Sequence, residues 1–377
     1  MKKILAVVMC LAAGMSAFAQ SISLPPSGDN QRSSVTQWIG PVSVTIQYSS
    51  PNVHGPNGED RKGHIWGELV HYGFVDQGYG TSKAAPWRAG ANENTTITFS
   101  HDVKIGGESI KAGTYGLFLD VEKEGNWNWI FSTNSTRWGS YYYDPKEDAL
   151  RVKTSPQDAE YTEYLTFSFT DREAASAVAY LQWENKRIPF KIDVPHVNEI
   201  YLSQIRGELM GNRMGFDYQP WMDAAQFCAR NKINLEEALT WADNAISGQF
   251  IGREDFASLQ TKAQVLYAMN RDSEADVVMG KAIKHPTANV AEVHQYGRAL
   301  LAAGKTDKAM EVFKTNRQLH PDDKFTTYVG LARGYSATGD KKNAIKNWEI
   351  AIKNIPENQK AFLPQYEAEV KKLKGGA

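Results

Sequence analysis

Hydrophobic and polar residues alternate in the first half of this chain and recur at helical spacing in the second half. Val42, Val44 and Ile46 alternate with polar neighbours, and comparable short runs with a period of two continue to about Val194. Alternation over short runs is typical of strands that bury one face. It predicts an antiparallel β-sandwich over residues 35–195.

Turn-forming residues separate several of these runs. Pairs of turn-forming residues between alternating segments predict hairpins. Proline in a strand favours an edge position, which we expect for Pro189. The expected turn pairs are Gly106-Gly107, Glu124-Gly125 and Asn185-Lys186.

Helical spacing begins near residue 196 and continues almost to the end of the chain. The fold class that follows is multidomain β + α, with the antiparallel β-sandwich followed by helices. The predicted segments are a signal peptide (1–19), a flexible lead-in (20–34), the β-sandwich domain (35–195), a linking helix (196–218), helical repeats (219–358), and a capping helix with a tail (359–377).

A small residue recurs every 34 or 35 positions in the helical half. Ala275, Ala309 and Ala344 each follow another small residue by twelve positions and precede a bulky apolar residue by four. Glycines or asparagine, suited to a left-handed helix end, stand five positions before each alanine. The residues that define the repeat include Ala263, Ala275, Gly297, Gly304, Ala309, Phe313, Pro321, Ala332, Gly339, Ala344, Trp348 and Pro356.

This spacing resembles that of tetratricopeptide (TPR) repeats over about residues 219–358. The resemblance implies a TPR-like α-solenoid that binds a protein partner. Members that grip a carboxylate line their groove with Lys, Arg and Asn. Basic residues here are either such groove residues or scattered solvated charges: Arg298, Lys305, Arg333 and Lys341.

The first nineteen residues have the pattern of an export signal. Lys2 and Lys3 precede an apolar stretch, and Ala17-Phe18-Ala19 forms a small-x-small cleavage site. The stretch is too short to span a bilayer, and Met9 before Cys10 argues against a lipid anchor. We therefore expect a periplasmic or extracellular protein without a membrane span.

The net charge of −1 gives no electrostatic case for binding nucleic acid. Removal of the signal peptide leaves Cys228 as the only cysteine, so no intramolecular disulfide is expected.

Polar, cationic and aromatic residues crowd among glycines between residues 54 and 96. Side chains of this kind on glycine-bent loops are what a binding site on a rigid scaffold needs. The candidate ligand-binding residues are Trp87, Arg88, Asn92, His54, Arg61, Trp66 and His71.

A family resemblance rests on motifs in this region. Ile65-Trp66-Gly67-x-Leu69-Val70, Trp87-Arg88-x-Gly90-Ala91-Asn92 and Lys111-Ala112-Gly113-Thr114-Tyr115 occur in order. With further motifs over about residues 33–195, they resemble a secreted bacterial family known as domain of unknown function 2911. The resemblance implies no reaction. His71 replaces an expected proline, and Phe74–Pro86 is extra length.

The segment from Trp87 to Asn92 has the chemistry of a small-molecule site. A guanidinium binds carboxylate, phosphate or paired hydroxyls, and an indole can stack on a sugar. The alternative is structural, with Arg88 paired to Glu93 or Asp102. Tyr141, Tyr142 and Tyr143 after Trp138 form either an aromatic sugar platform or a strand whose rings are shared between core and surface; we favour the latter.

No recognised catalytic motif is present, and the loop histidines lack metal-ligand spacing, so no metal or cofactor is predicted. We therefore expect a non-catalytic binding protein of the bacterial envelope, with a protein partner on the repeats and a glycan or small anion on the β-domain. The alternative is a carbohydrate- or small-acid-binding enzyme centred on Trp87, Arg88, Asn92 and His71.

Overall fold

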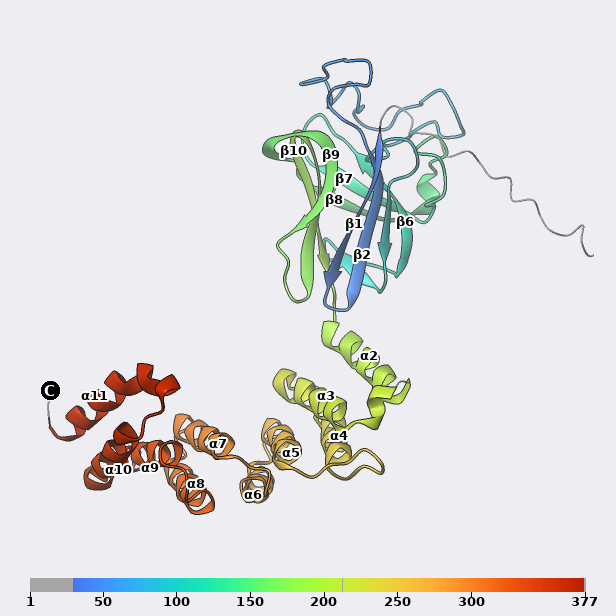
Figure 1. Cartoon of the computed structure of the whole chain (residues 1–377). Coiled ribbons are helices and arrows are strands. Elements are labelled where there is room, and N and C mark those ends of the chain that lie inside the picture. The colour runs from blue at the N-terminus through green and yellow to red at the C-terminus, as the bar shows by residue number, and fades with distance from the viewer. Residues whose placement is uncertain (1–29, 212, 376–377) are drawn as a thin grey trace, which may run out of the picture. The chain divides into compact units, whose positions relative to one another are not determined.

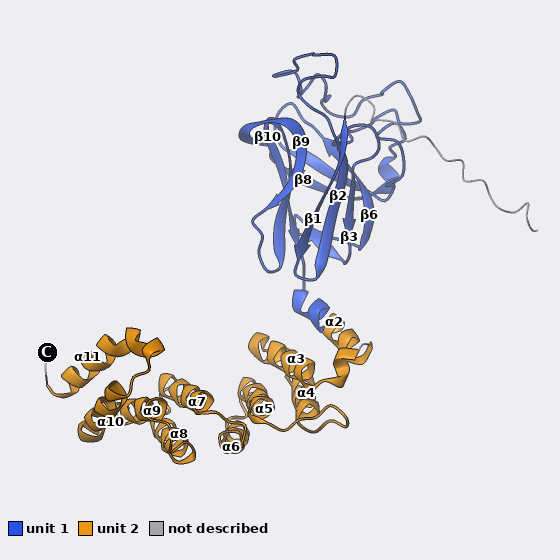
Figure 2. Cartoon of the chain, viewed as in Figure 1, with its two compact units in different colours: residues 1–202 blue, residues 203–377 orange. Residues whose placement is uncertain are grey.

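A computed structural model describes residues 30–211 and 213–375, which form a strand-rich part followed by helices (Figure 1). The chain divides into two compact units, residues 1–202 and 203–377 (Figure 2). The predicted signal peptide and most of the predicted lead-in lie outside the described residues.

Two antiparallel sheets make up the first unit. The six-stranded sheet has the order β1-β2-β3-β6-β7-β8, and the four-stranded sheet has the order β5-β4-β10-β9. The strands are β1 (Gln31–Ile39), β2 (Val42–Ser50), β3 (Thr96–Phe99), β4 (Val103–Ile105), β5 (Glu108–Ile110), β6 (Gly113–Asp120), β7 (Trp127–Ser132), β8 (Asp148–Thr154), β9 (Gln157–Thr170) and β10 (Ser176–Asp193).

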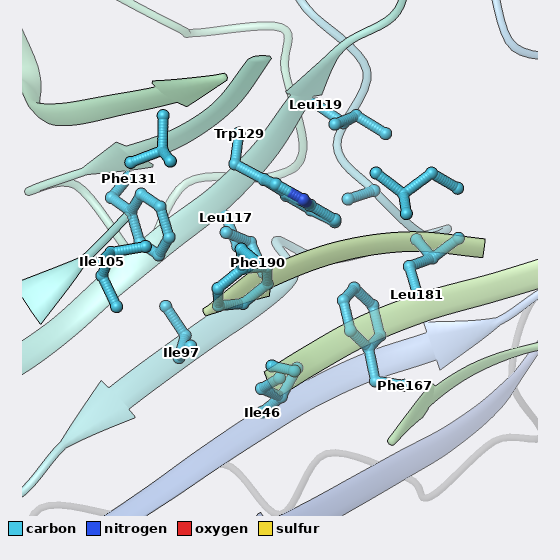
Figure 3. Packing of buried hydrophobic residues seen from close by; sticks show 14 of the residues in the cluster. Ile46, Ile97, Ile105, Leu117, Leu119, Trp129, Phe131, Phe167, Leu181 and Phe190 are labelled. Atoms are coloured by element: carbon cyan, nitrogen blue, oxygen red, sulfur yellow. The ribbon is translucent and has the colours of Figure 1, made fainter. Parts of the chain in front are cut away.

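The apolar faces of the two sheets share one core (Figure 3). Trp129 of β7 is fully buried, and its ring centroid lies 5.1 Å from that of Phe190 and 6.1 Å from that of Phe167. Ile46 of β2 is also fully buried, as its place in an alternating run predicts. The β-sandwich prediction is confirmed.

Strand β10 differs from the prediction. The expected turn at Asn185-Lys186 is absent, since Ser176–Asp193 is one continuous strand. Glu184 has a φ of 53°, and the pairing of β10 with β9 shifts register on both sides of it. A β-bulge therefore produces the irregularity that suggested a turn.

Pro189 also lies outside its expected edge position, because β10 runs between β4 and β9. The pairing of β10 with β9 ends at Arg187, and its pairing with β4 begins at Ile192. Proline lacks an N–H donor, and it occupies the stretch where the strand passes from one partner to the other.

The second unit is built of consecutive helical pairs, which confirms the predicted TPR-like α-solenoid after the sandwich. α3 pairs with α4, α5 with α6, α7 with α8 and α9 with α10. The helices are α2 (Val197–Gly211), which crosses the boundary between the units, α3 (Tyr218–Asn231), α4 (Leu235–Ser247), α5 (Phe256–Ala268), α6 (Asp272–Ala282), α7 (Val290–Ala302), α8 (Thr306–Leu319), α9 (Thr326–Ala337), α10 (Lys341–Lys353) and α11 (Leu363–Leu373).

The repeat residues lie where close helix packing needs them. Ala263, Ala275, Ala309, Ala332 and Ala344 are all fully buried. The two glycines at the expected helix ends, Gly304 and Gly339, have φ angles of 72° and 80°, which a side chain would strain.

The end of the array is covered by α11. Tyr366 of α11 packs on Trp348 of α10 with ring centroids 5.0 Å apart, and Val370 and Leu373 join the same apolar cluster. Such a cover shields an apolar surface that no further repeat buries. Among the described residues, no helix is both long enough and apolar enough to cross a bilayer.

Candidate functional site

Four tryptophans pack together, and two of them, Trp66 and Trp87, belong to the long connection between β2 and β3. The ring centroids of Trp66 and Trp127 are 5.1 Å apart, and Trp87 stacks on Trp183 at 6.1 Å with an angle of 17° between the planes. The Trp87 side chain is part of the sandwich core and only 8% exposed. Its ring is therefore not open for stacking on a ligand.

Arg88 connects two loops. Its Nη1 donates a hydrogen bond to the Asn92 carbonyl oxygen at 2.6 Å, and its guanidinium carbon lies 4.9 Å from the centroid of the Tyr141 ring. Gly139 lies so close to the guanidinium that a β-carbon there would overlap it. Asp102, considered above as a partner for Arg88, instead accepts from Lys111 at 2.8 Å.

His54 and Arg61 lie in an exposed polar group beside β9. His54 Nδ1 is 2.9 Å from a carboxylate oxygen of Glu163, and Arg61 Nη2 is 3.7 Å from a carboxylate oxygen of Glu59. Both side chains therefore have acidic neighbours within the chain.

His71 lies elsewhere, half-buried beside Gly73. Its Nδ1 donates to the Gly73 carbonyl oxygen at 3.0 Å, and its buried Nε2 has no hydrogen-bond partner among the described residues. Burial lowers the pKa of this imidazole, which favours the neutral ring. The candidate side chains thus lie in a tryptophan cluster, in the Arg88 group, beside β9 and beside Gly73.

A polar cavity of about 260 Å³ lies next to the Arg88 group. It is formed on the outer side of β1, β2 and β3 and by the loops that precede β3 and follow β7. Its lining includes Arg32, Gln47, Glu93, Asn94, Arg137 and Trp138.

These lining residues are not among the candidate ligand-binding residues predicted from the sequence, because they are spread over more than a hundred positions. Only the register of β1 with β2 and of β2 with β3 brings Arg32, Gln47 and Thr96 to one surface. Two features of the sequence lay close to this surface: the polar run after Trp87, which ends in Glu93 and Asn94, and the aromatic segment that begins at Trp138.

A wider hollow of about 690 Å³ near β4 and β5 is a weaker candidate. Asp102, one of its charged residues, is bound by Lys111 and by the backbone N–H of Ala112. No group of three or more His, Cys, Asp or Glu side chains placed to hold a metal ion occurs within residues 30–211 and 213–375.

The first helices of the repeats carry a basic surface around His294. This side chain on α7 is 8% exposed, and burial, together with the charges of Arg333 and Arg298, lowers its pKa to about 4. Arg298 is exposed one turn along α7, and the Arg333 guanidinium carbon on α9 lies 5.6 Å from the centroid of the Trp348 ring. The two positive charges therefore flank one side of adjacent helices.

Comparison with known proteins finds one family model that matches the strand-rich part of the chain. Residues 30–192 match the model of a family described as protein of unknown function (DUF2911), which confirms the predicted resemblance over that range. No curated protein matches the chain.

Solved structures match 42% of the chain. One contains nearly identical TPR-like repeats ascribed to a kinesin light chain of Podosopora anserina, with 17% identity, 86% of that chain covered and a TM-score of 0.31. Another is residues 41 to the end of MamA from Desulfovibrio magneticus RS-1, with 18% identity, 94% of that chain covered and a TM-score of 0.26.

Proposed function

We propose that this chain, in which a domain matching the DUF2911 family precedes a TPR-like array, is an exported, non-catalytic binding protein of the bacterial envelope. The array binds a protein partner, and the sandwich supplies a second binding surface. Export is supported by the signal-like pattern of residues 1–19.

The observation that carries the proposal is the surface shared by α7 and α9. These first helices of successive repeats pack against each other, so residues from both helices contribute to one surface. Repeat arrays use such surfaces to bind extended segments of other proteins. Arg298 and Arg333 give this surface positive charge.

The charge of the surface defines the partner chemistry. Lys305, another basic residue of the array, is engaged by Asp272, with its Nζ 3.2 Å from a carboxylate oxygen. Arg298 and Arg333 instead act electrostatically on buried His294 and lower its pKa. An acidic segment or a C-terminal carboxylate would be attracted to these two guanidinium groups. The proposed partner is therefore a protein with an acidic segment.

The test uses the full-length chain as bait in envelope extracts of the cells that produce it. We expect one or more proteins to be retained by the wild type and lost from the double variant Arg298→Glu, Arg333→Glu. The matched control is Lys314→Glu, Lys346→Glu, which makes the same charge change on exposed residues of α8 and α10. Equal retention by both double variants, or no specific retention by the wild type, would count against the proposal.

Export is tested separately by mass spectrometry of the protein made in those cells. Cleavage after Ala19 gives a mature chain that begins at Gln20. An N-terminus that retains Lys2 and Lys3, together with fractionation with the cytoplasm, would contradict the export proposal.

A further inference from the structure

We propose that the cavity beside Trp138 binds one pyranose ring, either of a free sugar or of a residue in a glycan. This site lies in the sandwich unit and does not depend on the proposed partner of the helical array. None of the seven candidate ligand residues identified from the sequence lines it.

The floor of the cavity is the outward face of the six-stranded sheet. In the register of β2 with β3, Gln47 lies opposite Thr96, and Arg32 of β1 lies opposite Ser49 of β2. Side chains alternate along a strand, so these residues point away from the core that Ile46 enters. The floor therefore presents amide, hydroxyl and guanidinium groups.

A glycine allows a loop to pass over this face. A β-carbon at Gly116 of β6 would lie 2.5 Å from the carbonyl oxygen of Asn134, which is too close for any side chain. The same carbonyl oxygen accepts a hydrogen bond from Asn94 Nδ2 at 3.4 Å. The loop that contains Asn134 thus forms one wall of the cavity, and the loop that contains Asn94 forms another.

The wall that carries Trp138 is held in place from two sides. Arg137 donates two hydrogen bonds to the Glu147 carboxylate, both of 2.7 Å, and a third to the Tyr142 carbonyl oxygen at 2.5 Å. Arg88 lies against Tyr141 in the same loop. Such fixed walls reduce the ordering cost of binding a small ligand.

Asn94 contributes a buried amide to the wall. The residue is only 9% exposed and lines the cavity, and its Oδ1 has no hydrogen-bond partner within the described residues. A buried polar atom without a partner costs about 1–3 kcal/mol. The Oδ1 atom is itself closed off from solvent, so Asn94 holds the wall through its Nδ2 hydrogen bond to Asn134 and is not an open acceptor for a ligand.

The balance of charge favours a neutral ligand over an anion. Arg137 is neutralised by Glu147, which leaves Arg32 and Glu93 as opposite charges in the lining. Glu93 already accepts a hydrogen bond from Ser49 Oγ at 3.2 Å, and a carboxylate repels phosphates and acids. Amides offer both donors and acceptors and a carboxylate offers strong acceptors, so these groups bind sugar hydroxyls well.

Trp138 provides the apolar contact that a sugar ring needs. Its side chain is 51% exposed, unlike that of Trp87, so one part of the indole is free for a ligand. Ligand pockets usually measure about 300–1,000 Å³, and this cavity of about 260 Å³ lies just below that range, which suits a ligand no larger than one ring. The site therefore combines an exposed indole with hydrogen-bonding groups for hydroxyls.

Saturation-transfer NMR and tryptophan fluorescence on the full chain test the proposal. The probes are the methyl glycosides of glucose, galactose, mannose and N-acetylglucosamine, and a tetrasaccharide of each sugar. We expect at least one methyl glycoside to bind saturably, with a dissociation constant of about 1 mM. Binding only of the monosaccharide form indicates a free sugar, and tighter binding of the tetrasaccharide indicates a glycan.

Variants connect the binding to this cavity. Trp138→Ala and Glu93→Gln should each weaken it at least about tenfold. The controls are Trp38→Ala, at an indole that is 62% exposed on β1 outside the cavity, and Glu108→Gln on β5, and both should bind as the wild type does. The proposal is overturned if no probe binds, if Trp138→Ala binds like Trp38→Ala, or if inorganic phosphate binds more tightly than every glycoside. None of these outcomes tests the proposed binding of a protein partner by the helical array.

Discussion

Some side chains in this protein have structural roles where their chemistry suggests ligand binding. Arg88 has the donors of an anion-binding residue, yet its contacts are the Asn92 carbonyl oxygen and the Tyr141 ring. Both groups belong to loops beside the polar cavity. Arg88 therefore acts as a positioning residue, and its removal should affect stability before it affects ligand chemistry.

We expect Arg88→Ala to lower the free energy of unfolding of the sandwich by roughly 1–3 kcal/mol, because a charged hydrogen bond and a cation–π contact are lost. Urea denaturation of the full chain measures this loss. The control is Arg172→Ala, at an exposed arginine between β9 and β10. Equal stability of the two variants would contradict a positioning role.

His294 makes the stability of the array depend on pH. Its pKa is lowered by burial to about 4, against about 6.5 for an unperturbed histidine. Between about pH 6.5 and pH 4 the ring is protonated in the unfolded state and neutral in the folded state. The contribution of His294 to the unfolding free energy is therefore fully present above about pH 6.5 and is lost as the pH falls towards 4. Arg298 and Arg333 also face the ring, while Asp323 opposes their effect.

We expect the array to lose about 2 kcal/mol of unfolding free energy between pH 7.5 and pH 5 through His294 alone. His294→Gln should lack this component, since the amide does not titrate. An NMR titration of the histidine ring gives the direct measurement. Titration of His294 at or above pH 6.5 would show that the ring is not buried as described.

The sequence predicted the repeat residues better than the ligand residues, for a physical reason. Ala263 allows close helix packing, and Gly304 adopts the left-handed conformation at a helix end. Both requirements are local, and they recur at a fixed spacing. Arg32 and Trp138 share a cavity only through sheet register and a loop that crosses Gly116. No spacing in the chain encodes that approach.

Helix packing in the array depends on where glycine is required and where it is not. A β-carbon at Gly297 of α7 would overlap the ring of Phe313 on α8. A β-carbon at Gly280 of α6 would meet nothing within 4 Å. Two glycines in the same array therefore have opposite expected responses to alanine.

Gly297→Ala should lower the unfolding free energy by about 1–3 kcal/mol, because the added methyl group overpacks the helix pair. Gly280→Ala should raise it by about 0.5–1 kcal/mol, since alanine reduces the conformational freedom of the unfolded chain. Urea denaturation followed by circular dichroism at helical wavelengths measures both. A neutral Gly297→Ala would show that the packing of α7 on α8 is misassigned, and a destabilising Gly280→Ala would show that the surroundings of Gly280 on α6 are not open.

In the strands, the rule that pairs of turn-forming residues mark a connection fails at one place. Turn residues correctly marked the connections at Gly106-Gly107 and Glu124-Gly125, which join β4 to β5 and β6 to β7. Asn185-Lys186 looked similar, but the left-handed residue is Glu184 and it creates a bulge inside β10. A bulge and a turn need similar backbone conformations, so only strand pairing separates them.

At the scale of the whole molecule, two cores stabilise two units. The sandwich core and the array clusters contain no residue in common, and the division falls at Leu202 and Ser203. Cys228 of α3 is fully buried in the second unit, and burial raises the pKa of its thiol to about 11. The thiol therefore reports selectively on the opening of the helical unit.

We expect Cys228 to resist alkylation in the native mature chain and to become reactive when the array unfolds. Gly297→Ala should shift the labelling midpoint in urea to lower concentration, whereas Arg88→Ala should leave it unchanged. A shift of equal size in both variants would show that the two units unfold as one.

The most direct test of the central claim, that the array binds a protein partner through its first helices, is photo-crosslinking in the cells that produce the protein. A photoreactive residue at exposed Gln295 of α7, next to His294, should yield a crosslinked protein that disappears in the Arg298→Glu, Arg333→Glu background. The same residue at exposed Lys314 of α8 should yield none. No crosslink at Gln295, or equal crosslinks at both positions, would contradict the account.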